Sequence, residues 1–98
     1  MIRIIYSWKV APEHMESFIK TWKRTTNKIH EEVKGAQGSF MLQGEADSSQ
    51  IKTIAKWDSL EDWQQFWNES KPTQMQSMHD LGERISVEIF KEVDDFTR

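Results

Sequence analysis

The sequence lacks cysteine, which excludes a disulfide framework, thiolate metal ligands and a cysteine nucleophile. It also lacks any run of about eighteen apolar residues, so we expect no membrane-spanning segment and no membrane partner. No basic segment followed by an apolar stretch marks a signal peptide, and we therefore expect a cytoplasmic protein. No internal repeat, linker or low-complexity stretch divides the 98 residues, a length that suits one domain.

The sequence also has few positively charged residues and few apolar residues. The 13 Lys and Arg are scattered and outnumbered by 16 Asp and Glu, which argues against a nucleic-acid partner. Apolar residues make up 37% of the chain, below the usual ~45–50%, yet five residues are Trp. This balance predicts a core built from aromatic side chains. It also leaves room for a shared interface as a second source of stability.

The first third of the chain predicts a strand followed by a helix. Alternation of apolar residues predicts a strand over residues 2–10. The face that it predicts to point inward carries Ile2, Ile4, Tyr6, Trp8 and Val10. Pro12 suits the first turn of a helix, which we expect over residues 12–33. Its apolar stripe contains Met15, Phe18, Ile19, Trp22, Ile29 and Val33. We expect Trp22, at the centre of this stripe, to be buried against a sheet.

The remainder predicts a hairpin, two short helices and a last strand. We expect a turn at residues 35–38, strands at 39–43 and 51–57, and a loop between the strands. Ser59 is a candidate N-cap for a helix whose apolar side contains Leu60, Trp63, Phe66 and Trp67. Lys71-Pro72 interrupts this helix, and a capping box from Thr73 to Gln76 begins a second one, with an apolar side of Met75, Met78 and Leu81. A strand follows over residues 84–93, with Ile85, Val87 and Ile89 alternating along it. Residues 94–98 are expected to form a tail outside a single domain of residues 1–93.

The predicted order is β-α-β-β-α-β, which is the ferredoxin-like arrangement of the α+β class. It implies a four-stranded antiparallel sheet with the helices on one face. The other face is expected to carry Ile5, Ile54 and Phe90, and an apolar sheet face needs a cover. A second copy of the chain would supply that cover, so we expect a homodimer.

Two segments carry a resemblance to a known family. The helix that begins at Pro12 ends in Gly35-Ala36-Gln37-Gly38-Ser39-Phe40, and a strand-to-helix junction reads Ala55-Lys56-Trp57-Asp58-Ser59-Leu60-Glu61-Asp62-Trp63. With the order of elements, these segments resemble the antibiotic biosynthesis monooxygenase (ABM) domain family over residues 2–91. The resemblance implies a dimeric α+β barrel. It also implies one of three functions: a cofactor-independent oxygenase of phenols or quinols, a haem-degrading monooxygenase, or a protein without known activity.

The haem-degrading members pair an Asn on the first strand with a Trp and a His in the second helical region. Here the first-strand position falls on Tyr6 or Ser7, and the other two candidates are Trp67 and His79. An ungapped alignment from Trp57 places Phe66 at the Trp position. Because the Asn is missing, the favoured expectation is a protein with no bound cofactor, and haem is the alternative.

The residues themselves suggest where chemistry could occur. The chain has three histidines, and we interpret His14 and His30 as surface residues. His79 shares a helical edge with Met75, which makes it the candidate catalytic base. The resemblance to the cofactor-independent oxygenases implies that Tyr6 or Ser7 is the candidate hydrogen-bond donor to an oxygen that gains charge. A pocket for a small planar aromatic ligand is expected to be lined by Trp8, Trp22, Trp63, Phe66, Trp67, Met75 and Met78.

Two hypotheses from different classes follow. The first is a small monooxygenase that oxidises a planar phenol or quinol with O₂. The second is a non-catalytic dimeric module that binds a ligand or only stabilises a complex. A base inside the pocket would separate them.

Overall fold

The computed structural model describes residues 1–69 and 75–97. Its elements in chain order are β1 (Ile2–Lys9), the 3₁₀ turn η1 (Pro12–His14), α1 (Met15–Glu32), β2 (Ala36–Gln43), β3 (Gln50–Trp57), α2 (Leu60–Glu69), α4 (Gln76–His79) and β4 (Glu83–Lys91). The strands form one sheet in the order β2-β3-β1-β4, and neighbouring strands are antiparallel.

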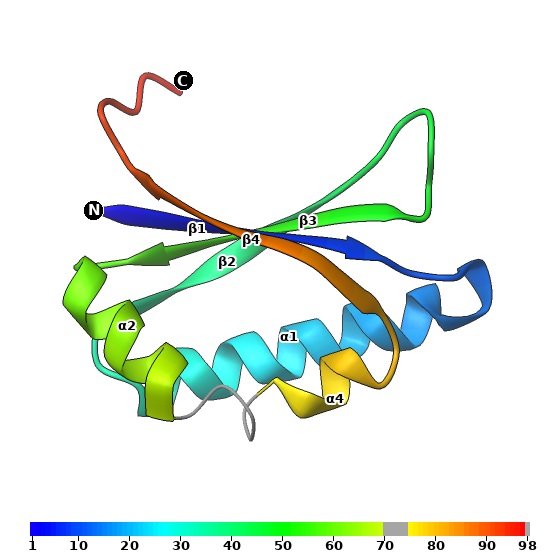
Figure 1. The fold of residues 1–98 in the computed structure, drawn as a ribbon, viewed down its shortest axis with the longest axis horizontal. Helices are drawn as coiled ribbons and strands as arrows, with labels where there is room; N and C mark the ends of the chain where they lie inside the picture. Colours follow the sequence, from blue (N-terminus) through cyan, green and yellow to red (C-terminus); the bar gives the residue numbers. More distant parts are fainter. Residues whose placement is uncertain (70–74, 98) are drawn as a thin grey trace.

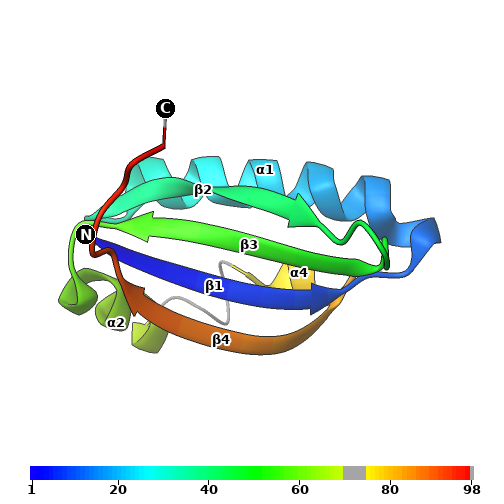
Figure 2. The ribbon, with the colours of Figure 1, turned by 90° about the horizontal axis from the view of Figure 1, so that it is seen from above.

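Helices α1, α2 and α4 lie on one face of the sheet (Figure 1). Seen from above, α1 runs along β2 at one side of the sheet, and β4 forms the opposite edge (Figure 2). This is the ferredoxin-like α+β fold that the element order predicts. We call the covered side the helical face of the sheet and the other side the outer face.

The core lies between the sheet and the helices. On β1, the side chains of Ile4, Tyr6 and Trp8 are buried, as is Val10 just beyond the strand, which confirms the predicted inward parity. Their antiparallel partners on β3 are Ala55, Thr53 and Ile51, so the two central strands present one shared set of side chains to the helices.

Helix α1 differs from its prediction at its start and in its face. Pro12 begins a 3₁₀ turn rather than the helix itself, and the α-helix starts at Met15. The buried side chains of α1 are Phe18, Thr21 and Thr25. The prediction that Trp22 is buried is wrong: it is half-buried, because its indole lies at the edge of the covered face and donates a hydrogen bond to Ser39 on β2.

Strand β2 begins earlier than expected. Residues 36–38 belong to the strand and do not form a separate turn, although the register with β3 shifts between Ala36 and Ser39. Gly35 makes the sharp entry with a φ of +85°, and a Cβ there would collide with the side chain of Asp62. Only glycine meets both demands, since positive φ and close approach each disfavour a side chain.

The second half of the chain contains two corrections. Ser59 Oγ accepts the backbone N–H of Asp62 at 3.2 Å, so the predicted N-cap of α2 is confirmed, but Leu60 is 38% exposed and is not part of the apolar side. The predicted break at Lys71-Pro72 and the first residues of the second capping box lie outside the described residues.

The alternation expected for the last strand is interrupted at Ile85. The pairing of β1 with β4 shifts between Ser7 and Trp8, which removes Ile85 from the regular alternation and leaves it 59% exposed. Val87 packs against the core, but Ile89 is 49% exposed although it pairs with the buried Ile4.

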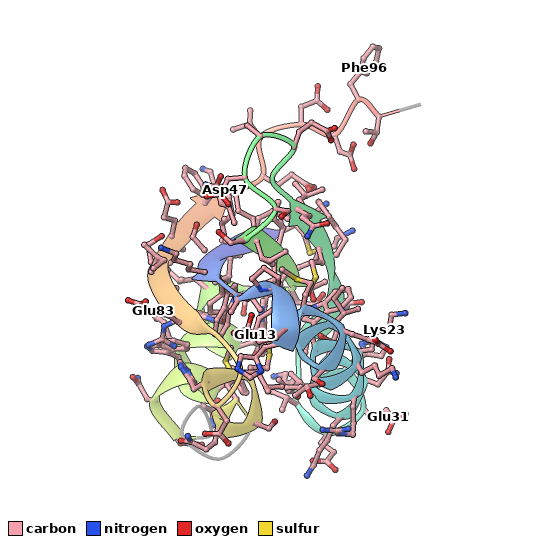
Figure 3. The ribbon with its side chains drawn as sticks, turned by 90° about the vertical axis from the view of Figure 1, so that its right-hand side faces the viewer. Glu13, Lys23, Glu31, Asp47, Glu83 and Phe96 are labelled. Carbon is pink, nitrogen blue, oxygen red and sulfur yellow. The ribbon has the colours of Figure 1, made fainter. Side chains whose placement is uncertain are left out.

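The outer face carries a contiguous row of apolar side chains. Phe40, Ile54 and Ile5 are consecutive partners across β2, β3 and β1. Phe40 is 47% exposed, and Leu42 and Phe90 on the same face are each 49% exposed. The Arg3–Glu92 ion pair, at 2.8 Å, holds the end of β4 against β1. Beyond it the tail leaves the sheet, and Phe96 points away from the rest of the molecule (Figure 3).

Candidate active site

A cavity of about 50 Å³ lies between α1 and the helical face of the sheet. Tyr6 of β1 and Thr53 of β3, which pair directly across the two strands, contribute to its sheet side. The edge of α1 contributes Trp22, Thr26 and His30. The walls are therefore largely apolar with a few polar groups, which is the usual composition of a small-molecule site.

Four of the expected pocket residues line this cavity: Trp22, Phe66, Met75 and Met78. The other three, Trp8, Trp63 and Trp67, pack nearby and are not among the described residues that line it. Trp8 is fully buried on the helical face of the sheet, where its ring meets Phe18 of α1 edge-on at 5.2 Å between centroids.

Tyr6 contributes a polar hydroxyl group to the sheet side of the cavity. Its hydroxyl accepts a hydrogen bond from Nε1 of Trp63 at 3.0 Å, and its side chain is buried. Burial raises the pKa of Tyr6 to about 12, against smaller opposing effects of the Trp63 hydrogen bond and the positive charge of Arg84. The phenol therefore keeps its proton at neutral pH. Because its oxygen accepts from Trp63, that proton is left to donate to a partner.

An aromatic cluster supports Tyr6 from the side of α2. Trp63 and Trp67 stack with ring centroids 5.3 Å apart, and Trp67 lies 6.0 Å from the Tyr6 ring. The Arg84 guanidinium sits 4.8 Å from the Trp67 ring centroid, a cation–π contact. The Trp67 ring and the Trp63 hydrogen bond together restrict the position of the Tyr6 side chain.

The raised pKa of Tyr6 gives a direct spectroscopic prediction, because Tyr6 is the only tyrosine in the chain. We expect the near-ultraviolet absorbance of tyrosinate to appear with a midpoint near 12 in the folded protein and near 10 after unfolding in denaturant. An acid whose pKa rises on folding stabilises the folded state below its unfolded pKa. This contribution, about 3 kcal/mol for two pKa units, is lost as the pH rises from about 10 to about 12. A folded midpoint near 10 would contradict the buried phenol.

A polar edge of α1 faces β2 across the cavity. Nε1 of Trp22 donates to Ser39 Oγ at 2.9 Å, and Thr26 Oγ1 lies 3.4 Å from the same oxygen. Since Ser39 accepts the indole N–H, its own hydroxyl proton can be given to Thr26 or to a ligand.

His30 is exposed, as expected from the sequence, but it also lines the cavity, which was not expected. Its Nδ1 lies 2.7 Å from the carbonyl oxygen of Ala36. A spacing of four residues connects Trp22, Thr26 and His30, so one helical edge carries all three. This four-residue spacing is the sequence feature that could have indicated a place for His30 beside Trp22 and Thr26.

The structure places the other two candidate catalytic residues away from the cavity. The ring of His79 lies 5.4 Å from that of Trp8 and borders an open depression that also contains Lys9, His14 and Arg84. Its pKa is lowered by partial burial and by the positive charge of Arg84, against a smaller raising effect of Asp80. Ser7 points to the outer face, where its Oγ accepts from Nζ of Lys52 at 2.9 Å.

Haem does not fit this arrangement. The cavity of about 50 Å³ is a third of the ~150 Å³ that holds a single benzene ring. The expected axial ligand, His79, is not among the described residues that line it. Within residues 1–69 and 75–97, no cluster of three or more His, Asp or Glu is suited to a metal ion, and none of the helices has the length and apolarity to cross a membrane.

The fold and the aromatic cavity define a small α+β domain with an internal site between the sheet and its helices. The chain belongs to the antibiotic biosynthesis monooxygenase family, whose model matches residues 1–81. None of the curated proteins matches the chain.

Solved structures share the fold at low sequence identity. An asparagine-to-alanine variant of SnoaB, a cofactor-independent oxygenase from Streptomyces nogalater, superposes with a TM-score of 0.78 at 12% identity, covering 99% of this chain and 97% of that one. A protein from Bordetella bronchiseptica gives 0.80 at 14% identity, with coverage of 94% and 96%. A conserved protein of unknown function from Bacteroides thetaiotaomicron gives 0.73 at 17% identity, with coverage of 91% and 94%.

Proposed function

We propose that this protein is a small monooxygenase that oxidises an electron-rich phenol or quinol with O₂ in the cavity beside Tyr6, without a bound cofactor. The observation that carries the proposal is a buried, protonated tyrosine that lines an apolar cavity. Membership of the monooxygenase family and the shared fold with a cofactor-independent oxygenase support it. His79 and Ser7 are not part of the proposal, because they lie elsewhere.

The reaction balances without a redox centre in the protein. A phenol with an open ring position and O₂ give a quinone and water. One oxygen atom enters the ring, and the other leaves as water with the hydrogens of the phenolic O–H and the ring C–H. The electrons come from the substrate, so the protein has to bind the substrate, exclude water and control protons.

Tyr6 is suited to stabilise the negative charge that develops on the substrate during this reaction. Deprotonation of the substrate spreads charge over its oxygen and ring, and a fixed O–H donor in a dry site stabilises that anion before it transfers an electron to O₂. The Trp63 N–H and the neighbouring Trp67 ring hold the Tyr6 hydroxyl in place. Its donor is therefore oriented before the substrate binds.

The size of the cavity restricts the substrate. At about 50 Å³ it is smaller than the space that takes one benzene ring, so the walls must move to admit even a single-ring phenol. Met75 and Met78 line it and have the adaptable side chains that allow such a movement. This points to a substrate of one or two rings. It is also the observation that favours the alternative, a non-catalytic module whose cavity is simply an imperfectly filled core.

The test is oxidation of α-naphthol by the purified protein under isotopically labelled O₂, with no cofactor added. The proposal predicts naphthoquinone that carries one labelled oxygen. Absence of oxygen uptake with α-naphthol and with single-ring phenols would leave the non-catalytic module.

We also propose that the protein forms a homodimer through the outer face of the sheet. The row of Phe40, Ile54 and Ile5, extended by Leu42 and Phe90, supports this, because exposed apolar patches of that kind mark interaction surfaces.

The dimer predicts different effects for two leucines of similar exposure. Leu42 lies on the outer face and is 49% exposed, whereas Leu60 begins α2 and is 38% exposed. Leu42→Glu is expected to weaken dimerisation at least about tenfold, since it buries a charge in the interface. Leu60→Glu is the matched control and should change it little. Sedimentation equilibrium measures both. A wild-type protein that sediments as a monomer would contradict the proposal.

A further inference from the structure

The proposed function requires a base, since the phenolic substrate must lose a proton before it can react with O₂. Among the described residues that line the cavity, only Tyr6 and His30 have titratable side chains. Tyr6 is not suited to accept a proton, because its pKa of about 12 keeps its hydroxyl protonated at neutral pH. The remaining titratable side chain is His30.

The hydrogen bond of His30 defines its tautomer. Nδ1 lies 2.7 Å from the carbonyl oxygen of Ala36, and a carbonyl oxygen can only accept, so Nδ1 carries the hydrogen. In the neutral ring, Nε2 then holds the free lone pair. The same hydrogen bond ties the last turn of α1 to the first residue of β2 and so fixes the ring plane.

The surroundings of His30 suit proton transfer in both directions. It shares a helical edge with Thr26, which approaches the Ser39 hydroxyl, so polar groups able to orient a substrate O–H lie beside the imidazole. His30 is also exposed on one side, whereas Tyr6 is 5% exposed. A proton taken from the substrate can therefore pass from His30 to water.

We propose that His30 is the general base of this site, an inference that rests on the proposed monooxygenase function. The substrate O–H bond breaks with its electron pair left on oxygen, and a new N–H bond forms at Nε2 to give an imidazolium. Tyr6, which lines the same cavity, is the proposed donor to the negative charge that spreads over the substrate anion. The imidazolium returns its proton to water, so the base is regenerated.

His30→Asn tests this assignment with little change to the fold. The Asn amide nitrogen occupies nearly the position of imidazole Nδ1 and can donate to the Ala36 carbonyl, but nothing replaces Nε2. His14→Asn and His79→Asn are matched controls, because the chain has three histidines and these two lie outside the lining of the cavity. Denaturant unfolding of each variant checks that it is folded, and His30→Gln serves as a second variant if His30→Asn is not.

The first probe is p-nitrophenol, an electron-poor phenol whose neutral and ionised forms absorb at different wavelengths. Below the pH range in which it ionises in water, it is expected to bind to the wild type and both controls as the anion. It is expected to bind to His30→Asn as the neutral phenol, with the ionised fraction reduced at least tenfold. A purely structural role of His30 would leave the ionised fraction unchanged, and that result would overturn the inference.

The oxidation of α-naphthol separates this inference from the function on which it rests. We expect the rate for His30→Asn to fall about a hundredfold, within the usual range for a general base. A wild type that oxidises α-naphthol at the same rate as His30→Asn would overturn the role of His30 and leave the monooxygenase proposal standing. A wild type that neither oxidises α-naphthol nor binds p-nitrophenol would overturn both.

Discussion

Trp8→Ala is expected to lower the free energy of unfolding by about 3–5 kcal/mol, the range for large aromatic truncations in protein cores. Trp8 is 1% exposed and lies near the end of the central strand β1, with Phe18 edge-on to its ring at 5.2 Å. Its indole N–H donates to Thr53 Oγ1 at 3.3 Å, so the truncation also leaves a buried hydroxyl without this donor. Chemical denaturation followed by circular dichroism measures the loss.

Trp22→Ala is the matched control for this prediction. Trp22 is half-buried at the edge of α1, and its loss is expected to cost about 1–2 kcal/mol, within the common range for single substitutions. A cost for Trp22→Ala equal to or above that for Trp8→Ala would show that the core is centred on α1 and not on the central strands.

Tyr6→Phe is expected to lower the rate of α-naphthol oxidation by about a hundredfold or more, the usual cost of removing a donor to a developing oxyanion. Binding of p-nitrophenol should change much less, because the ring and the apolar walls remain. The variant also leaves the buried Nε1 of Trp63 without its acceptor, which should cost about 1–3 kcal/mol of stability.

Trp63→Phe separates the two roles of this hydrogen bond. It removes the N–H that Tyr6 accepts and keeps the phenol, so its rate should fall less than tenfold. If Trp63→Phe slows the reaction as much as Tyr6→Phe, the Tyr6 hydroxyl is not the donor, and its contribution is the packing of the aromatic cluster.

Some of the site was predictable from the sequence for a simple geometric reason. Side chains alternate strictly along a strand, so the apolar alternation of β1 places Tyr6 and Trp8 on the covered face and Ser7 on the other. The pairing of Thr53 with Tyr6 depends on the register between β1 and β3, which alternation does not supply. The composition predicted an aromatic core, and the buried Trp8, Trp57 and Trp63 confirm it.

The position of His30 could not be read from the apolar stripe alone. An amphipathic helix can rotate by part of a turn and still cover its apolar side chains, and α1 buries Thr21 and Thr25 while Trp22 lies at the edge. That rotation brings Thr26 and His30 to the cavity. The location of His79 outside the cavity lining could not be predicted for a related reason, since α4 has only four residues and so short a helix does not define its inward side.

The last strand forms as predicted, but it contains one irregularity that has no local signature. The shift between Ser7 and Trp8 in the pairing with β4 removes Ile85 from the alternation, whereas Val87 and Ile89 stay opposite Tyr6 and Ile4. Arg84 thereby pairs with Trp8, and its guanidinium reaches the Trp67 ring. Sequence alternation alone predicts an uninterrupted strand with Ile85 inward, and it cannot anticipate that contact.

The most direct test of the central claim is the fate of labelled O₂ when the purified protein, with no added cofactor, turns over α-naphthol. A cofactor-independent monooxygenase acting through Tyr6 should place one labelled oxygen in naphthoquinone and the other in water, with a wild-type rate at least about a hundredfold above that of Tyr6→Phe. Naphthoquinone without label, or equal rates for the wild type and Tyr6→Phe, would contradict the account.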